Sequence, residues 1–136
     1  MKDVLKMARV QLWVIAVFIL FKLIRTSALE NNPHEYIQIL LLSFPNLCEA
    51  IIGVMTVTMI GLYLSKKMKI SKETIYITAT ILAAIYVITQ EMKFHNLGGN
   101  NIYDPNDVIF SIIGLVVGYV IVYQMKPNLQ MDSTLK

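Results

Sequence analysis

The chain has 136 residues, of which 56% are hydrophobic and only 15% are charged, and its mean hydropathy is +0.59. This composition excludes an ordinary soluble domain, because it offers too little polar surface to solvate a globule and its apolar residues form long segments bounded by charges, as a bilayer requires. The formal net charge of +3 comes from basic residues scattered at segment ends, which indicates lipid headgroups rather than nucleic acid as the polar partner.

The first apolar segment predicts a membrane span over about residues 7–28. Lys22 and Arg25 lie near its end, where their long side chains can reach the interface. A cleaved signal peptide is the alternative, because residues 26–28 are small, but the two basic residues just before them argue against cleavage. After a polar loop, the apolar run 37–44 is too short to span, so it either lies along the interface or leads into the next helix.

Pro45 and Asn46 predict the start of a second helix over about residues 46–64, because proline is tolerated in a first turn. A short basic stretch over 65–73 leads to a third helix over about 74–90. The polar stretch 91–107 contains two glycines followed by two asparagines, a strong turn signal, and a fourth helix follows over about 106–125. We therefore expect one all-α domain, a transmembrane four-helix bundle with a polar outer loop between helices three and four.

The basic residues predict the orientation of the bundle. With four spans, both termini and the 65–73 loop share one side. That side carries nine basic residues: Lys2, Lys6, Arg9, Lys66, Lys67, Lys69, Lys72, Lys126 and Lys136. The opposite side carries three: Lys22, Arg25 and Lys93. The positive-inside rule therefore places both termini in the cytoplasm.

Carboxylates gather on the predicted outer side: Glu30, Glu35, Glu49, Glu91, Asp104 and Asp107. Glu49 is expected about one turn inside the outer boundary, where a carboxylate is costly unless it is paired or faces water. Glu91 ends the third helix and Asp107 opens the fourth, so three segments bring carboxylates to one depth. We expect an outward-facing polar pocket there, with Lys22 and Arg25 balancing its charge.

Structural roles explain several of these residues equally well. Asp104-Pro105-Asn106-Asp107 is a typical helix start, so capping alone is an alternative role for both aspartates. A solvated loop is the alternative for Gln90, Glu91, Lys93 and His95. Asp107, Ser111, Gly114 and Gly118 share one helical face, which we expect to pack closely on another helix.

The motifs of known catalytic and metal sites are missing. The chain has no nucleophile elbow, no H-E-x-x-H and no glycine loop that follows a strand, so no catalytic residue is assigned and an enzyme is less favoured than a binding protein. Cys48 is the single cysteine, and His34 and His95 lack a partner at metal-ligand spacing. We expect no metal and no cofactor.

The last third of the chain resembles the VanZ-like family of small bacterial membrane proteins. The resemblance rests on Gln90-Glu91, a polar loop, Asp104 and Asp107 opening the last helix, and the glycine pair Gly114 and Gly118. The chain departs from the family at Ser111, where an asparagine is common, and at Pro45-Asn46 and Glu49, where an aspartate and a histidine are common. Members of the family are associated with the bacterial envelope and with resistance to the glycopeptide teicoplanin.

The resemblance implies a bacterial inner-membrane protein whose outer pocket binds an envelope-related ligand or a lipid headgroup. The expected ligand-binding residues are Asn46, Glu49, Gln90, Glu91, His95, Asp104 and Asp107. The alternative is a structural subunit or homo-oligomer that uses Gly114 and Gly118 to dock on another membrane protein. An enzyme or proton-coupled carrier that uses the carboxylates is a third hypothesis.

Overall fold

The computed structural model describes residues 2–31, 34–65, 70–92 and 104–127. Within them the chain forms α1 (Lys2–Asn31), α2 (Glu35–Leu64), α3 (Lys72–Glu91) and α4 (Pro105–Met125). Each of these helices is long and apolar enough to cross a membrane. The expected all-α fold with four candidate membrane spans is therefore confirmed.

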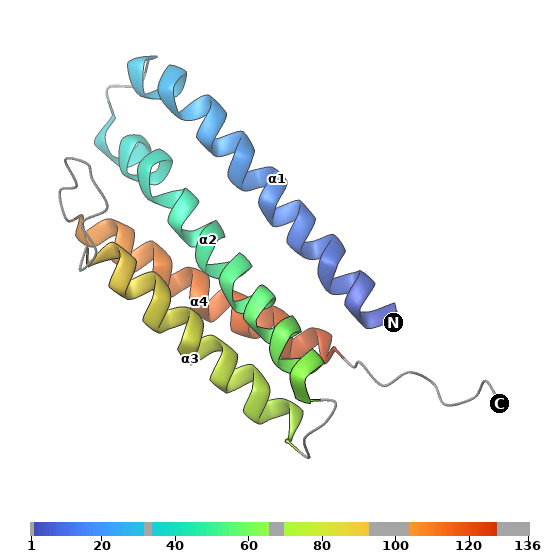
Figure 1. Cartoon of the computed structure of the whole chain (residues 1–136). Helices are drawn as coiled ribbons and strands as arrows, with labels where there is room; N and C mark the ends of the chain where they lie inside the picture. The colour runs from blue at the N-terminus through green and yellow to red at the C-terminus, as the bar shows by residue number, and fades with distance from the viewer. Residues whose placement is uncertain (1, 32–33, 66–69, 93–103, 128–136) are drawn as a thin grey trace.

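The helices lie side by side and alternate in direction along the chain, so the bundle has two distinct ends (Figure 1). At one end α1 and α3 begin and α2 and α4 end. We call it the lysine end, because Lys6, Lys72 and Lys126 lie there. At the other end α2 and α4 begin and α1 and α3 end. We call it the carboxylate end, because Glu35, Glu91, Asp104 and Asp107 lie there.

The second helix begins eleven residues earlier than the sequence predicted, at Glu35 rather than Asn46. The N-cap of α2 is His34, whose carbonyl oxygen accepts from the backbone N–H groups of Ile37 and Gln38. The run 37–44 therefore leads directly into the helix, and the predicted start at Pro45 is wrong. Proline is compatible with the interior of a transmembrane helix, because neighbouring helices stabilise the turn from which it removes a hydrogen bond. Pro45 is buried inside the bundle.

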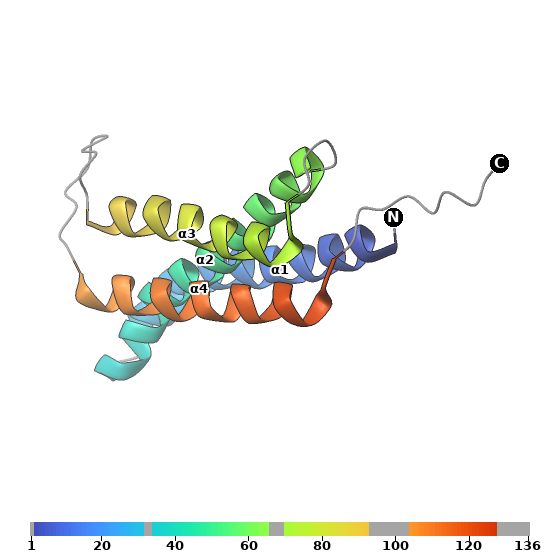
Figure 2. The ribbon, with the colours of Figure 1, turned by 90° about the horizontal axis from the view of Figure 1, so that it is seen from below.

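α2 is the central helix of the bundle, and it packs on each of the other three. Figure 2 shows it crossing diagonally behind α3 and α4. Phe44 of α2 stacks on Phe21 of α1 with ring centroids 4.1 Å apart, and Gln11 of α1 donates to the Thr56 hydroxyl at 2.8 Å. α1 has few contacts with the other two helices. As a result, only 6% of the residues in its most apolar stretch are buried, against 39% in α2.

Two glycines let α4 approach α2 closely. A Cβ atom added at Gly114 would collide with the backbone carbonyl oxygen of Leu47 and lie 2.8 Å from the Cβ of Ala50. At Gly118 it would lie 3.1 Å from the Cβ of Val54. The prediction that this face of α4 packs on another helix is confirmed, and the helix is α2 of the same chain. A contact between these glycines and another protein chain would require α2 to separate from α4.

The contacts between α2 and α4 also set their relative height. Ser43 lies beside Asp107, and Val54 lies beside Gly118, so the two helices run in the same direction. α2 begins eight residues before Ser43, whereas α4 begins two residues before Asp107. At 1.5 Å per residue, the start of α2 extends about 9 Å beyond the start of α4. Both α1 and α2 project past the other two helices at the carboxylate end (Figure 1).

One buried hydroxyl in α2 predicts a stabilising substitution. The Thr58 side chain is fully buried, and its Oγ1 atom has no hydrogen-bond partner within the described residues. An unpaired buried hydroxyl costs about 1–3 kcal/mol, and valine has nearly the same shape. Thr58→Val is therefore expected to stabilise the protein by about 1 kcal/mol, measured as thermal unfolding in detergent. A lower melting temperature would show that the hydroxyl has a partner in solution.

Candidate functional site

A partly buried hydrogen bond joins α2 to α4 at the carboxylate end. The Ser43 hydroxyl, which is fully buried, donates to Oδ1 of Asp107 at 2.7 Å. Asp107 is half-buried and lies in the first turn of α4, where the free N–H groups and the helix dipole favour a negative charge. A carboxylate accepts about four hydrogen bonds, so this one leaves capacity for a further donor.

The predicted cap of α4 is confirmed. Asp104 has extended backbone angles, and its side chain accepts from the backbone N–H of Asn106 at 2.9 Å. The same Oδ1 atom accepts from the Asn106 side-chain amide at 3.0 Å, and Pro105 occupies the first turn. Asp104 is half-buried beside the first turn that holds Asp107. Capping is therefore a role that Asp104 performs, whatever else it binds.

Glu49 lies deeper in the bundle than the sequence predicted. It comes fourteen residues after the start of α2 and six residues after Ser43, which is about 9 Å below the level of Asp107. It stands one turn before Gly53, which faces Ala83 of α3, so Glu49 belongs to the α3 side of α2. The expectation that Glu49 and Asp107 lie at one depth is therefore wrong. Helix two begins before Pro45, so Glu49 lies further along it than the sequence predicted.

The remaining candidates lie around the same end. Asn46 is half-buried on α2, one turn above Glu49. Gln90 is exposed and Glu91 half-buried in the last turn of α3, whose end meets the start of α4 at the carboxylate end. His95 and Lys93 lie outside the described residues. The structure therefore brings Asn46, Glu91, Asp104 and Asp107 to one end of the bundle, with Glu49 below them.

The two basic residues of α1 occupy a different side of α2. The Lys22 ammonium lies over the ring of Phe18 in its own helix, 4.6 Å from the centroid, and Arg25 is half-buried one turn further on. α1 packs mainly on α2 and barely reaches α4. The charge-balancing role of Lys22 and Arg25 stays a prediction.

Ser43 is the site residue that the sequence reasoning missed. Hydroxyl groups inside transmembrane helices commonly bond across to a neighbouring helix, and Ser43 stands in an otherwise apolar run. That signal is readable only if the run 37–44 belongs to a membrane-spanning helix. The apolar run 37–44 is too short to span a membrane by itself, so the sequence alone does not place Ser43 inside a span.

The chemistry of this end is that of a hydrogen-bond acceptor site. Carboxylates predominate, side-chain amides can both donate and accept, and the Ser43 hydroxyl already donates its hydrogen bond to Asp107. Among the described residues there is no group of three histidine, cysteine, aspartate or glutamate side chains that could hold a metal ion. The arrangement can bind ligands that carry ammonium or hydroxyl donors.

Comparison of the chain with protein-family models, with curated proteins and with solved structures finds no match.

Proposed function

We propose that this chain is a VanZ-like protein of a bacterial inner membrane, with both termini cytoplasmic, whose carboxylate end binds an envelope-related ligand or a lipid headgroup. The observation that carries the proposal is the hydrogen bond from buried Ser43 to Asp107. It holds a carboxylate in a fixed position between two helices at the carboxylate end of the bundle. Fixed, partly desolvated acceptors bind more tightly than mobile ones, because less freedom is lost on binding.

The acidic character of this end indicates the class of ligand. Asp104, Asp107, Glu91 and Glu49 all accept hydrogen bonds when ionised, so they favour a ligand with ammonium or hydroxyl donors. Side chains on a helix tilt toward its N-terminus, and for α2 that is the carboxylate end. The Cα–Cβ bond of Glu49 therefore tilts toward the carboxylate end, in the direction of Asn46.

A structural subunit is the second candidate function, and the Asp104 cap favours it. A carboxylate that completes a helix start needs no ligand to explain it. With Gly114 and Gly118 occupied by α2, a partner would dock elsewhere, and the outer face of α1 is the least covered surface of the bundle.

Substitutions at Asp104 separate the capping role from a ligand role. Serine also caps helices, so Asp104→Ser is expected to keep the melting temperature, whereas Asp104→Ala is expected to cost about 1 kcal/mol. If the carboxylate binds a ligand, both variants lose function at matched expression. If it only caps, Asp104→Ser behaves as the unmodified protein.

Asp107 and Glu49 test the binding proposal itself. We expect Asp107→Asn and Glu49→Gln to weaken resistance to teicoplanin and to reduce the amount of aminated lipid that copurifies with the full chain in mild detergent. Glu73→Gln is the matched control, because Glu73 lies in the first turn of α3 at the lysine end. Unchanged resistance and unchanged lipid content for both variants would remove the carboxylate end from the function.

A further inference from the structure

One side of the bundle leaves part of the central helix α2 uncovered. In the part of the chain that the structure describes, α1 and α3 do not contact each other. The hydrogen bond from Gln11 of α1 to Thr56 of α2 is exposed, and Ile60, one turn further along α2, is 53% exposed. Gly53, one turn before Thr56, faces Ala83 of α3. This stripe of α2 therefore reaches the surface between α1 and α3.

Lys22 and Glu49 lie on the same side of the bundle as this hydrogen bond. Residues seven apart on a helix lie two turns apart on one side of it. Phe18 follows Gln11 by seven residues, Glu49 precedes Thr56 by seven, and the two helices run in opposite directions, so Phe18 and Glu49 are level. The Lys22 ammonium lies 4.6 Å from the centroid of the Phe18 ring. A cation and a carboxylate thus stand at one height on this surface, which we call the open face.

These two charges lie deep in the membrane-spanning part of the bundle. Glu49 is close to the midpoint of α2, and the neighbouring Ala50 packs beside Gly114, which is close to the midpoint of α4. A charge at this depth is costly unless it is paired. Within the described residues no ion pair reaches Glu49, and the Lys22 ammonium lies over the Phe18 ring of its own helix. A single copy of the chain therefore does not neutralise either charge.

We infer that the open face binds a second copy of this chain, with Lys22 of each copy paired with Glu49 of the other. Opposite charges at one height make a membrane-protein surface complementary to itself. A two-fold axis along the membrane normal leaves heights unchanged and brings the cation of each copy to the carboxylate of the other. All four charges are neutralised in this way. The interface leaves Gly114 and Gly118 packed on α2, and it does not rest on ligand binding at Asp107.

A stripe of apolar side chains on α1 adds contact area beside the charges. Leu5, Leu12 and Ile19 follow one another at intervals of seven residues, and each is at least half exposed. Lys22 comes three residues after Ile19, so it is a neighbour of this stripe on the helix surface. Apolar residues that repeat every seven positions are suited to pack against the same stripe of a second helix. The second copy of α1 therefore has an apolar surface to meet as well as a charge.

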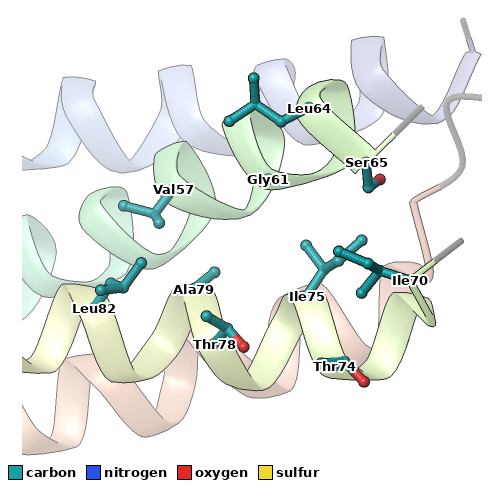
Figure 3. A pocket seen from close by; sticks show the side chains of 10 residues that line it. All are labelled: Val57, Gly61, Leu64, Ser65, Ile70, Thr74, Ile75, Thr78, Ala79 and Leu82. Carbon is teal, nitrogen blue, oxygen red and sulfur yellow. The ribbon is translucent and has the colours of Figure 1, made fainter. Parts of the chain in front are cut away.

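An apolar groove between α2 and α3 borders the open face toward the lysine end (Figure 3). Val57, which follows Thr56, and Leu64, which stands one turn after Ile60, line it from α2. No charged residue is among those that line the groove. The groove adds apolar surface at the edge of the interface, whereas the two charges choose the partner.

Charge reversal in two differently tagged copies tests the inference with the full chain. The two copies are coexpressed, one is captured through its tag in mild detergent, and the amount of the other is measured. The unmodified chain is expected to capture itself. Lys22→Glu paired with Lys22→Glu, and Glu49→Lys paired with Glu49→Lys, should each reduce capture by at least about tenfold, because like charges then meet in both contacts.

The decisive sample combines the two reversed chains. Lys22→Glu coexpressed with Glu49→Lys restores opposite charges in both contacts between copies, so capture should return to the level of the unmodified chain. Within each of these chains, residues 22 and 49 carry like charges, so a pair inside one chain would not be restored. Failure of this combination, with recovery in a chain that carries both reversals, would overturn the inference in favour of an internal pair. Absence of self-capture by the unmodified chain would overturn it too.

Two controls separate the interface from other effects of charge. Lys6→Glu and Glu35→Lys reverse exposed charges on the same two helices but at opposite ends of the bundle, and capture should not change. A loss with Lys6→Glu equal to that with Lys22→Glu would contradict a specific pair. Asp107→Asn tests the carboxylate end and should leave capture unchanged, so failure of the binding proposal and failure of this interface are distinguishable.

Disulfide crosslinking provides a second measurement if a reversed chain does not fold. In a Cys48→Ser background, Leu12→Cys places one cysteine beside the open face. Val116→Cys is the matched control, because Val116 is exposed on α4 and lies two residues before Gly118, which packs beside Val54. Oxidation in membranes is expected to link two copies through residue 12 far more than through residue 116. Equal or stronger linkage through residue 116 would place the contact elsewhere and overturn the inference.

Discussion

Replacing Gly114 by alanine is expected to destabilise the protein by about 2–3 kcal/mol, the upper part of the usual range for overpacking. The added methyl group would collide with the Leu47 carbonyl oxygen, and a backbone atom cannot turn aside as a side chain can. The gain of about 1 kcal/mol from the better helix propensity of alanine does not offset this cost. α4 must instead move away from α2 along their whole contact.

The matched control is Gly53→Ala. A Cβ atom there would lie 3.8 Å from the Cβ of Ala83, an ordinary contact, so the helix-propensity gain is expected to leave stability unchanged or raised by up to about 1 kcal/mol. Thermal unfolding of both variants in one detergent gives the comparison. Equal melting temperatures would mean that the close approach of α2 and α4 is not needed for the fold.

The hydrogen bond between Ser43 and Asp107 is expected to be worth about 1.5–3 kcal/mol, the range for a bond to a charged group. A double-mutant cycle with Ser43→Ala and Asp107→Ala measures this coupling as unfolding free energy. Each single variant should lose nearly as much as the double variant, because Asp107→Ala leaves the buried Ser43 hydroxyl, and Ser43→Ala the half-buried Asp107 carboxylate, without its partner.

A second polar pair between helices provides the comparison for this cycle. Gln11 and Thr56 join α1 to α2 at 2.8 Å, but both groups are neutral and the contact is exposed. Hydrogen bonds of this kind within membranes average about 0.6 kcal/mol, so their coupling should be the smaller. A larger coupling for Gln11 and Thr56 would contradict the assignment of Ser43 and Asp107 as the fixed element of the carboxylate end.

The spans could be predicted because hydropathy and helix caps are local properties. The start of α4 followed from Asp104 and Pro105, and its packing face followed from the spacing of Gly114 and Gly118, as the structure confirms. The error at Pro45 came from a residue that fits both a helix start and the interior of a membrane helix. Only packing against neighbouring helices distinguishes the two, and no local pattern records it.

The same error carried over to the candidate site. Moving the start of α2 from Asn46 to Glu35 lowers Glu49 within the bundle and adds Ser43 to the membrane-spanning helix. The partner of Asp107 therefore could not be predicted, since it lies sixty-four residues away and depends on the register of two helices. The identity of the carboxylates was readable from the sequence, but their relative heights were not.

The unequal helix lengths predict that this protein responds to bilayer thickness. The twenty residues of α3 match a hydrocarbon layer of about 30 Å, whereas the thirty residues of α1 and α2 reach about 45 Å. In a thin bilayer the extra turns of α1 and α2 extend into the headgroup region, beside the start of α4. In a thicker bilayer these turns lie within the hydrocarbon, and a less tilted bundle is favoured. The accessibility of Asp107 should therefore vary with the length of the surrounding lipid chains.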